Sequence, residues 1–257
     1  MRPKAAAICT HFGRKAQHYD QHAGLQRAMA WRLARRIASL PMPAGPMADL
    51  GAGSGLVGQA LQQLAPQHQL LQLDGSAALL HHNPLAGSTS QRLLWDLNDG
   101  LPACLQGSAL LTSSFGLHWL SQPAAALKQW AKALAPGGWL VVAVPVAGSF
   151  AQWHQAASRA EVPCTAWPLP AASELLQSAG SVLALRHHQE MQFSLRYGPG
   201  GRAFFRQLQQ LGAGYSDHPP LRPGQWRQLL NHWPADEQVS WRILMLLAQR
   251  PPNNAEP

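Results

Sequence analysis

The residues best suited to chemistry are an acid and a run of glycines in the stretch MADLGAGSGLVG, which begins at Met47. Asp49 is followed by Gly51, Gly53 and Gly55, between an apolar run and an amphipathic one. Glycine lets a backbone turn tightly and approach a ligand closely because it carries no Cβ atom. The stretch therefore predicts a strand, a ligand-binding turn and a helix, in that order.

The charge of Asp49 narrows the class of ligand. GSGLVG also fits the fingerprint of turns that hold the pyrophosphate of a dinucleotide. A carboxylate at the end of the first strand disfavours a pyrophosphate and favours a cationic group such as an ammonium or a sulfonium. We therefore expect a positively charged, nucleotide-like ligand.

Two further acids end the next two apolar runs. Asp74 closes QLLQLD nineteen residues after Gly55, the separation at which an acid accepts hydrogen bonds from ribose hydroxyls. Asp96 closes LLWD in the following run. For any one of these acids alone, a helix-capping or turn role is an equal alternative. Three acids at successive strand ends favour one ligand-binding edge.

The pattern DLGAGSG is identified as the first motif of Rossmann-like, class I S-adenosylmethionine-dependent methyltransferases. This resemblance implies S-adenosylmethionine as the cofactor and places Asp96 opposite its adenine amino group. The cofactor-binding residues that it implies are Asp49, Gly51, Gly53, Gly55, Asp74, Gly75, Asp96, Leu97 and Ser113. His18 and His22 lie one helical turn apart, but no third ligand accompanies them, and we expect no metal site.

The elements that must position these residues alternate along the chain. From Met47 to about Pro145, short apolar runs alternate with helical patterns, which predicts parallel strands joined by right-handed crossovers. The stretch Ala16–Leu40 predicts one amphipathic helix or two, ended by PMPAGP. Two late strands with helices between them extend the sheet edge. We expect an α/β, Rossmann-like class I methyltransferase fold, with a seven-stranded, mostly parallel sheet flanked by helices.

These sequence patterns predict that the chain has three parts. Residues 1–45 form an N-terminal helical lid, and residues 46–250 form the methyltransferase domain. That domain carries helical insertions at about 147–170 and 199–233, the second being a C-terminal helical insertion. Residues 251–257 form a disordered tail.

Charge and cysteine content limit the class of protein. The net charge is +8, and residues 1–36 hold eight Lys or Arg against one acid, Asp20, which favours an acidic partner. A solvated surface that aids solubility is the plain alternative. Three widely spaced cysteines predict no disulfide framework, and neither an export signal nor a membrane span is evident. We expect a cytoplasmic protein without membrane partners.

The stretch HFGRKAQHYDQHAGLQR, starting at His11, resembles the opening of the malonyl-acyl-carrier-protein O-methyltransferases of biotin synthesis. The residues that carry the resemblance are Phe12, Gly13, Arg14, Tyr19, His22, Ala23, Leu25, Gln26 and Arg27. TSSFGLHW and the late stretch FFRQLQQLGA agree with the same family, whereas PCTAWPLP retains only Trp167 of its expected features. The resemblance implies methyl transfer to the free carboxylate of a malonyl thioester, giving the ester that primes pimeloyl synthesis.

Four residues are candidates for the acceptor side of this reaction. The resemblance implies that Tyr19 and His22 lie in the lid, where Tyr19 donates a hydrogen bond to the carboxylate or lines the methyl donor. Arg206 offers a planar fork that matches a carboxylate, and Trp119 lies beside the expected transfer position. Ordinary roles on amphipathic or surface helices are the alternatives for Tyr19, His22 and Arg206.

The implied partner is an acidic acyl carrier protein that bears a malonyl group, or malonyl-CoA. The basic N-terminal segment is the expected docking surface for such a carrier. A methyltransferase acting on another small molecule, one acting on RNA and a non-catalytic binding module are the rival interpretations. The chain has Ser113, Ser114 and Phe115 where base-amino methyltransferases carry an Asn/Asp-Pro-Pro-aromatic turn, and we do not expect a nucleic-acid partner.

Overall fold

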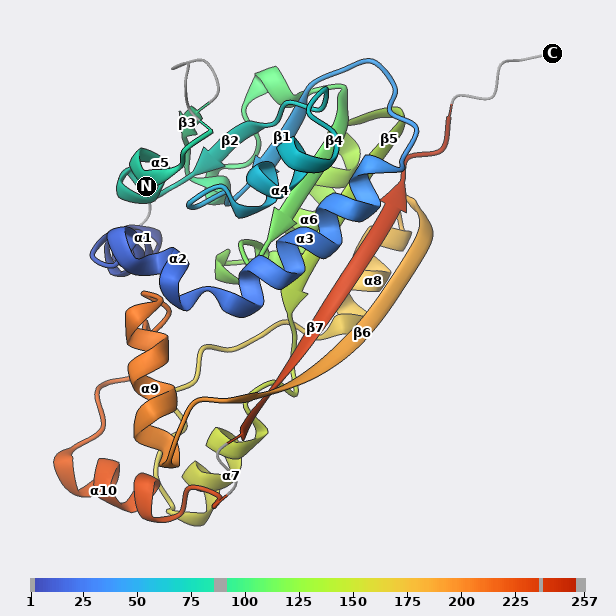
Figure 1. Ribbon diagram of the computed structural model, residues 1–257. Helices are drawn as coiled ribbons and strands as arrows, with labels where there is room; N and C mark the ends of the chain where they lie inside the picture. The colour runs from blue at the N-terminus through green and yellow to red at the C-terminus, as the bar shows by residue number, and fades with distance from the viewer. Residues whose placement is uncertain (1–2, 86–91, 236–237, 253–257) are drawn as a thin grey trace.

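The computed structural model describes residues 3–85, 92–235 and 238–252. Within these residues, one sheet has the strand order β3-β2-β1-β4-β5-β7-β6 (Figure 1). The strands are β1 (Met47–Leu50), β2 (Leu71–Asp74), β3 (Arg92–Leu94), β4 (Ser108–Ser114), β5 (Leu134–Pro145), β6 (Ala184–Arg196) and β7 (Gln238–Gln249). β1 to β5 pair in parallel, whereas β7 runs antiparallel to β5 and to β6. The predicted seven-stranded, mostly parallel α/β fold is confirmed.

Helices cover both faces of this sheet (Figure 1). The α-helices are α1 (Pro3–Gly13), α2 (Tyr19–His22), α3 (Gly24–Ala38), α4 (Leu56–Leu64), α5 (Ala77–His82), α6 (Pro123–Ala133), α7 (Ala151–Arg159), α8 (Ala172–Gly180), α9 (Gly200–Gln210) and α10 (Pro223–Asn231). The buried side chains of α3 and α4 belong to one hydrophobic core, and those of α6 and α8 belong to the other. Two separate cores therefore hold the sheet between layers of helix.

The apolar side of α3 shows why this helix packs on the sheet. Met29, Leu33 and Ile37 recur at helical spacing and are fully buried, while Arg32 and Arg36 remain exposed. Burying each of these large apolar side chains stabilises the fold by about 1.5–3 kcal/mol. The chain that precedes α3 is thereby fixed beside the carboxyl ends of the central strands.

The strands on one side of the sheet are much longer than the central ones. β6 and β7 contain 13 and 12 residues, whereas β1 and β2 contain 4 each. Their extra length carries α9 and α10, which lie between these two strands in the chain, past the carboxyl ends of the parallel strands. α9 thereby lies next to α1 and α2 (Figure 1). Both predicted insertions thus contain helices, although the division into domains stays a prediction.

The N-terminal region differs from the expected pattern in two respects. The stretch predicted as one or two helices is divided into a 3₁₀ turn, η1 (Ala16–His18), then α2 and α3, with the break at Ala23. The helix α1 lies before this stretch, within the residues 1–45 expected to form a helical lid, although no helical pattern is noted there in the sequence. No helix in the described ranges is long and apolar enough to cross a membrane. The expected tail, 251–257, lies outside the described residues from 253 onward.

Candidate functional site

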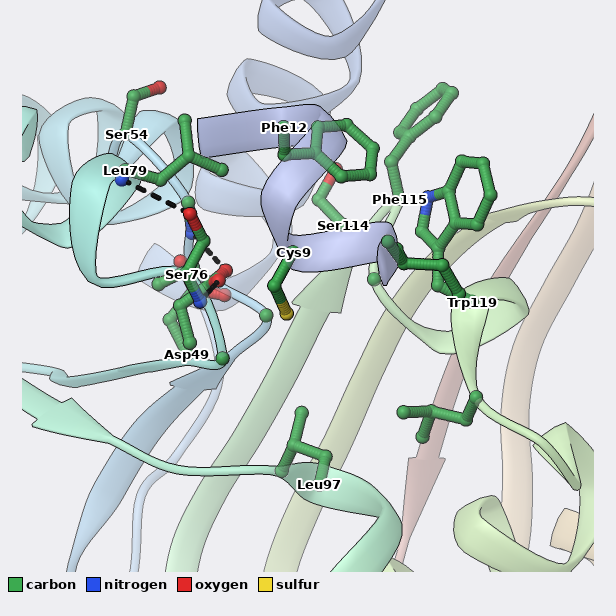
Figure 2. Close-up of a pocket in the computed structure, with 18 of the residues that line it drawn as sticks. Cys9, Phe12, Asp49, Ser54, Ser76, Leu79, Leu97, Ser114, Phe115 and Trp119 are labelled. Carbon is green, nitrogen blue, oxygen red and sulfur yellow. Dashed lines mark hydrogen bonds between the residues drawn. The ribbon is translucent and has the colours of Figure 1, made fainter. Parts of the chain in front are cut away.

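A cavity lies at the carboxyl ends of β1, β2 and β4, and α1 covers it (Figure 2). We call it the first cavity. Cys9 and Phe12 project from α1 toward it, and Phe115 and Trp119 approach Phe12 from the other side. The strand ends supply the polar residues and α1 supplies an apolar roof. The fold therefore brings the three predicted acids and most of the predicted glycines to one cavity.

The glycine-rich turn is shaped by its own backbone. The amides of Gly51 and Ala52 donate to the Leu73 carbonyl at 2.9 and 2.8 Å, and these two residues and Gly53 line the first cavity. Gly55 does not line it. Gly55 has a φ of +82°, and a Cβ there would lie 2.3 Å from the side-chain oxygen of Asn83. Gly55 thus shapes the start of α4 rather than the cavity wall.

Asp49 is the least satisfied polar group of the site. Its side chain is 1% exposed, and neither carboxylate oxygen has a hydrogen-bond partner among the described residues. Burial, together with the charge of Asp74, raises the pKa of Asp49 to about 8. A cation placed beside this carboxylate would restore its charged form. The residue therefore fits the ammonium or sulfonium group of S-adenosylmethionine.

Asp74 is held by backbone donors at the end of β2. Its two carboxylate oxygens accept from the amides of Gly53 and Ser76 at 2.8 and 2.7 Å. Burial raises the pKa of Asp74, and these backbone hydrogen bonds oppose that shift. The carboxylate, like Gly75 beside it, lines the first cavity, in agreement with the predicted place of the ribose-binding acid.

Asp96 caps the short 3₁₀ helix η3 (Leu97–Asp99). One carboxylate oxygen accepts from the backbone and side-chain nitrogens of Asn98 at 3.0 and 2.8 Å. The other oxygen is buried and has no partner in the described part of the chain. Asp96 and Leu97 both line the first cavity. The free oxygen suits an amino group such as that of adenine, which fits the implied cofactor.

The structure corrects the placement of Ser113. This residue is fully buried in β4, its hydroxyl donates to the Leu50 carbonyl at 2.6 Å, and it does not line the first cavity. Ser114 lines the cavity instead, and its buried hydroxyl has no partner among the described residues. Successive side chains of a strand point to opposite faces, so a shift of one residue changes the side that is reached.

A second cavity adjoins the first and is lined mainly by aromatic and aliphatic side chains. The residues that line both cavities are Phe12, Tyr19, Gln26, Phe115 and Trp119. Phe150, Trp153 and Trp241 lie deep in the second cavity, each less than 9% exposed. The residues that line it include no Lys, Arg, Asp or Glu. A largely apolar chamber therefore opens from the place where the cofactor is expected.

The four predicted acceptor-side residues divide into two pairs. Tyr19 and Trp119 line both cavities, and burial with the nearby charges of Asp20 and Asp74 raises the pKa of Tyr19. His22 lines neither cavity, and its carbonyl accepts from the side chain of Gln207.

Arg206 also lines neither cavity. It lies on the exposed side of α9, opposite the buried Phe205 and Leu208. The structure thus brings Tyr19 and Trp119 to the site and leaves His22 and Arg206 outside it. The fork of Arg206 does not reach either cavity.

The N-terminal helix α1 is fastened to the chain that follows α9. Lys4 forms an ion pair with Asp217, and its ammonium lies 4.5 Å from the ring centroid of Trp167. His11 packs edge-on against Tyr215, with ring centroids 5.6 Å apart. These contacts close the two cavities on the side away from the sheet and agree with the expected covering role of the N-terminal segment.

Sequence reasoning did not identify the residues that α1 contributes to the first cavity. They are Ala5, Ile8, Cys9 and Phe12. Their spacing of three, one and three places them on one side of a helix. This periodicity was the signal available in the sequence. Gln26 belongs to the N-terminal motif, but the motif by itself indicates no role for it.

Comparisons with known proteins agree with this geometry. A family model described as "Methyltransferase domain" matches residues 48–142, which contain the glycine turn and all three acids. A malonyl-[acyl-carrier protein] O-methyltransferase of Alcanivorax borkumensis is 29% identical over 95% of this chain and 86% of its own length. The biotin biosynthesis bifunctional protein BioCD of Bordetella avium is 30% identical over 88% of this chain and 48% of its length.

The fold also matches solved structures at low sequence identity. A protein from Bacillus halodurans superposes with a TM-score of 0.58 at 14% identity, covering 86% of this chain and 98% of that one. A likeness at this identity bears on the fold alone. The matching methyltransferase domain and the three acids at the first cavity both indicate the same ligand. S-adenosylmethionine is the cofactor.

Proposed function

Because the chain is a class I S-adenosylmethionine-dependent methyltransferase, its open question is the methyl acceptor, and we propose the free carboxylate of a malonyl thioester. The product would be the methyl ester that primes pimeloyl synthesis for biotin. The names of the relatives and the N-terminal motif support this assignment. The second cavity supports it independently, through the chemistry of its walls.

The proposal depends on the protonation state of His118. Among the described residues that line the second cavity, His118 is the one whose side chain ordinarily accepts a proton near neutral pH. Burial lowers the pKa of His118 to about 3. At pH 7 it is therefore a neutral and very weak base. A hydroxyl or ammonium acceptor would find no base here, whereas a carboxylate, with a pKa of about 4, needs none.

The cofactor supplies a methyl group on a positively charged sulfur, and a carboxylate oxygen can take that group without any proton transfer. The protein's part is to hold the oxygen in line and to exclude water that would solvate the anion. Trp119 packs against Phe12 and Trp167 at centroid distances of 5.3 and 5.0 Å, which makes a dry wall at the junction of the cavities. Once formed, the uncharged ester suits an apolar chamber better than the acid does.

An acidic acyl carrier protein is the proposed bearer of the malonyl group. α3 and the chain before it present exposed arginines that include Arg14, Arg32, Arg35 and Arg36. A surface of this charge attracts an acidic protein over long range and fixes its orientation. We place the reaction in the cytoplasm, where the three cysteines, free in the structure, would remain reduced.

A panel assay tests the proposal. Malonyl, glutaryl and acetyl thioesters are offered on acyl carrier protein and on coenzyme A, and the methyl ester is detected by mass. We expect malonyl thioester to gain the mass of one CH₂ group and acetyl thioester, which has no free carboxylate, to gain nothing. Methylation of RNA or of an amine by the same preparation, with no activity on any ω-carboxyl thioester, refutes the assignment.

A further inference from the structure

The junction of the two cavities is where a methyl donor and its acceptor must meet. Of the five side chains that line both cavities, two are phenylalanines. The polar atoms at the junction therefore belong to Tyr19, Gln26 and Trp119. All three side chains are uncharged, given the raised pKa of Tyr19. An acceptor carboxylate placed here would meet neutral donors rather than a cation.

Gln26 has no structural reason to be polar. Its side chain is 8% exposed and lines both cavities, and no side-chain hydrogen bond is made to its amide in the described part of the chain. Native structures seldom leave a polar group with so little access to solvent without a partner, and the space that this amide reaches is the junction of the two cavities. Its neighbours Met29 and Ala30 on the buried side of α3 are apolar, as packing requires. The amide is explained if a ligand supplies the missing partner.

The start of α3 also favours an anion at this place. α3 has 15 residues, no side chain caps its first turn, and that turn contains no acid. The amino end of a helix carries a partial positive charge and unpaired amides, which attract negative groups. Gln26 lies within this first turn. The unpartnered amide and the uncapped helix end therefore point to the same kind of ligand.

We propose that the side-chain amide of Gln26 and the phenol of Tyr19 together hold the acceptor carboxylate at the start of α3, as a clamp of neutral donors. This proposal rests on the proposed function and names the residues that would select its substrate. Neutral donors position the anion without pairing it to a cation, so its oxygen keeps more of its nucleophilic character. The clamp also explains how a cavity without Lys or Arg can prefer malonyl to acetyl.

The other carboxylate within reach of the junction is that of the cofactor's own methionine portion. We favour the acceptor because Gln26 lines both cavities, and not the first alone. The two sources differ in what a Gln26 variant loses. Loss of the acceptor contact weakens the binding of malonyl groups, whereas loss of a cofactor contact weakens the binding of S-adenosylhomocysteine.

The experiment uses Gln26→Met, which keeps the length of the side chain, Gln26→Glu, which opposes one carboxylate to another, and Tyr19→Phe. Gln62→Met and Gln62→Glu, on the exposed side of α4, are the matched controls. Calorimetry measures binding of malonyl- and acetyl-acyl carrier protein to the complex with S-adenosylhomocysteine, and kcat/KM is measured alongside. Circular dichroism and the melting temperature of the free protein report whether each variant is folded, and binding of S-adenosylhomocysteine is measured separately.

For the clamp, we expect Gln26→Met and Tyr19→Phe each to lower kcat/KM for the malonyl substrate by about 10- to 100-fold. Gln26→Glu should lower it further. The preference for malonyl over acetyl in binding falls in parallel, while the affinity for S-adenosylhomocysteine changes by less than about threefold. The Gln62 variants should match the wild type.

Two results overturn the clamp and leave the proposed function standing. One is an unchanged malonyl preference in the Gln26 variants. The other is a loss of S-adenosylhomocysteine affinity as large as the loss of kcat/KM, which would assign Gln26 to the cofactor. A wild-type protein that does not methylate malonyl-acyl carrier protein overturns the proposed function, and the clamp with it.

Discussion

Replacing Asp49 by asparagine tests whether the first cavity takes up its cation by giving up a proton. The pKa of Asp49 is raised to about 8, so about nine tenths of this carboxyl is protonated at pH 7. Burial also raises the pKa of Asp74, but two backbone hydrogen bonds, from Gly53 and Ser76, oppose that rise and stabilise its carboxylate, whereas the Asp49 carboxylate has no such partners. A bound cation stabilises the Asp49 carboxylate, which lowers its pKa and releases the proton.

The size of the effect follows from the shift in the pKa. If the pKa of Asp49 falls from about 8 in the free protein to below about 5 in the complex, about 0.9 proton leaves at pH 7. The dissociation constant of S-adenosylmethionine then falls about ninefold from pH 6 to 7 and about fivefold from pH 7 to 8. Above about pH 9 it levels off, because the free protein is already charged there.

Calorimetry in two buffers of different ionisation enthalpy counts the released protons directly. The amino group of the ligand also titrates, but it does so equally with every variant, so the difference between wild type and Asp49→Asn isolates Asp49. Asp99→Asn, at an exposed acid outside the cavity, is the matched control and should keep the wild-type curve. Equal proton release by wild type and Asp49→Asn between pH 6 and 8 would refute the reasoning.

Three further outcomes are expected. The pKa of Asp49 is higher in the folded protein than its ordinary value of 3.8, so the free wild type loses stability as pH rises from about 4 to 8. In scanning fluorimetry, Asp49→Asn should therefore have a higher melting temperature than the wild type at about pH 8–9 and an equal one below about pH 4. The rate of association with an acidic carrier protein should fall at least about fivefold when salt rises from 0.05 to 0.5 M, and also in Arg32→Glu. Lys128→Glu, on the other side of the sheet, is the control and should keep the wild-type rate. An association rate that does not depend on salt contradicts docking through these charges. Gly55→Ala should lower the free energy of unfolding by about 1–3 kcal/mol more than Gly107→Ala in urea titrations. Both glycines have positive φ, but a Cβ at Gly107 would meet nothing within 4 Å; equal losses would mean that the crowding at Gly55 has no effect.

The central sheet and the cofactor acids were predictable because their signals are local. The stretch QVSWRILMLLAQ, from Gln238 to Gln249, predicts the last strand, and β7 begins and ends at the same residues. Asp49, Asp74 and Asp96 each end an apolar run, and parallel strands bring such ends to one edge. The glycines predicted for the turn after β1 have positive φ in the structure, a backbone conformation that other residues rarely adopt.

The acceptor side was harder to predict because it depends on contacts between distant segments. The guanidinium of Arg206 suits a carboxylate, which makes it a candidate from its chemistry alone. The buried Phe204, Phe205 and Leu208, however, place it on the outer side of α9. Helical periodicity would have excluded it from the cavity. By contrast, no local pattern shows that Gln26 reaches the junction, since that depends on the break at Ala23 and on the packing of α3.

The buried polar atoms without partners show where this sequence departs from the needs of folding alone. Most such atoms in the described residues belong to side chains that line the two cavities, among them Asp49, Asp96, Ser114 and His118. A stable core would replace each by an apolar side chain of similar size. A ligand that forms hydrogen bonds with these atoms removes the free-energy cost of leaving them unpaired. Binding and folding are therefore coupled most strongly at these residues. The same coupling makes asparagine at Asp49 stabilising without cofactor and damaging with it, which a local packing account of that residue does not predict.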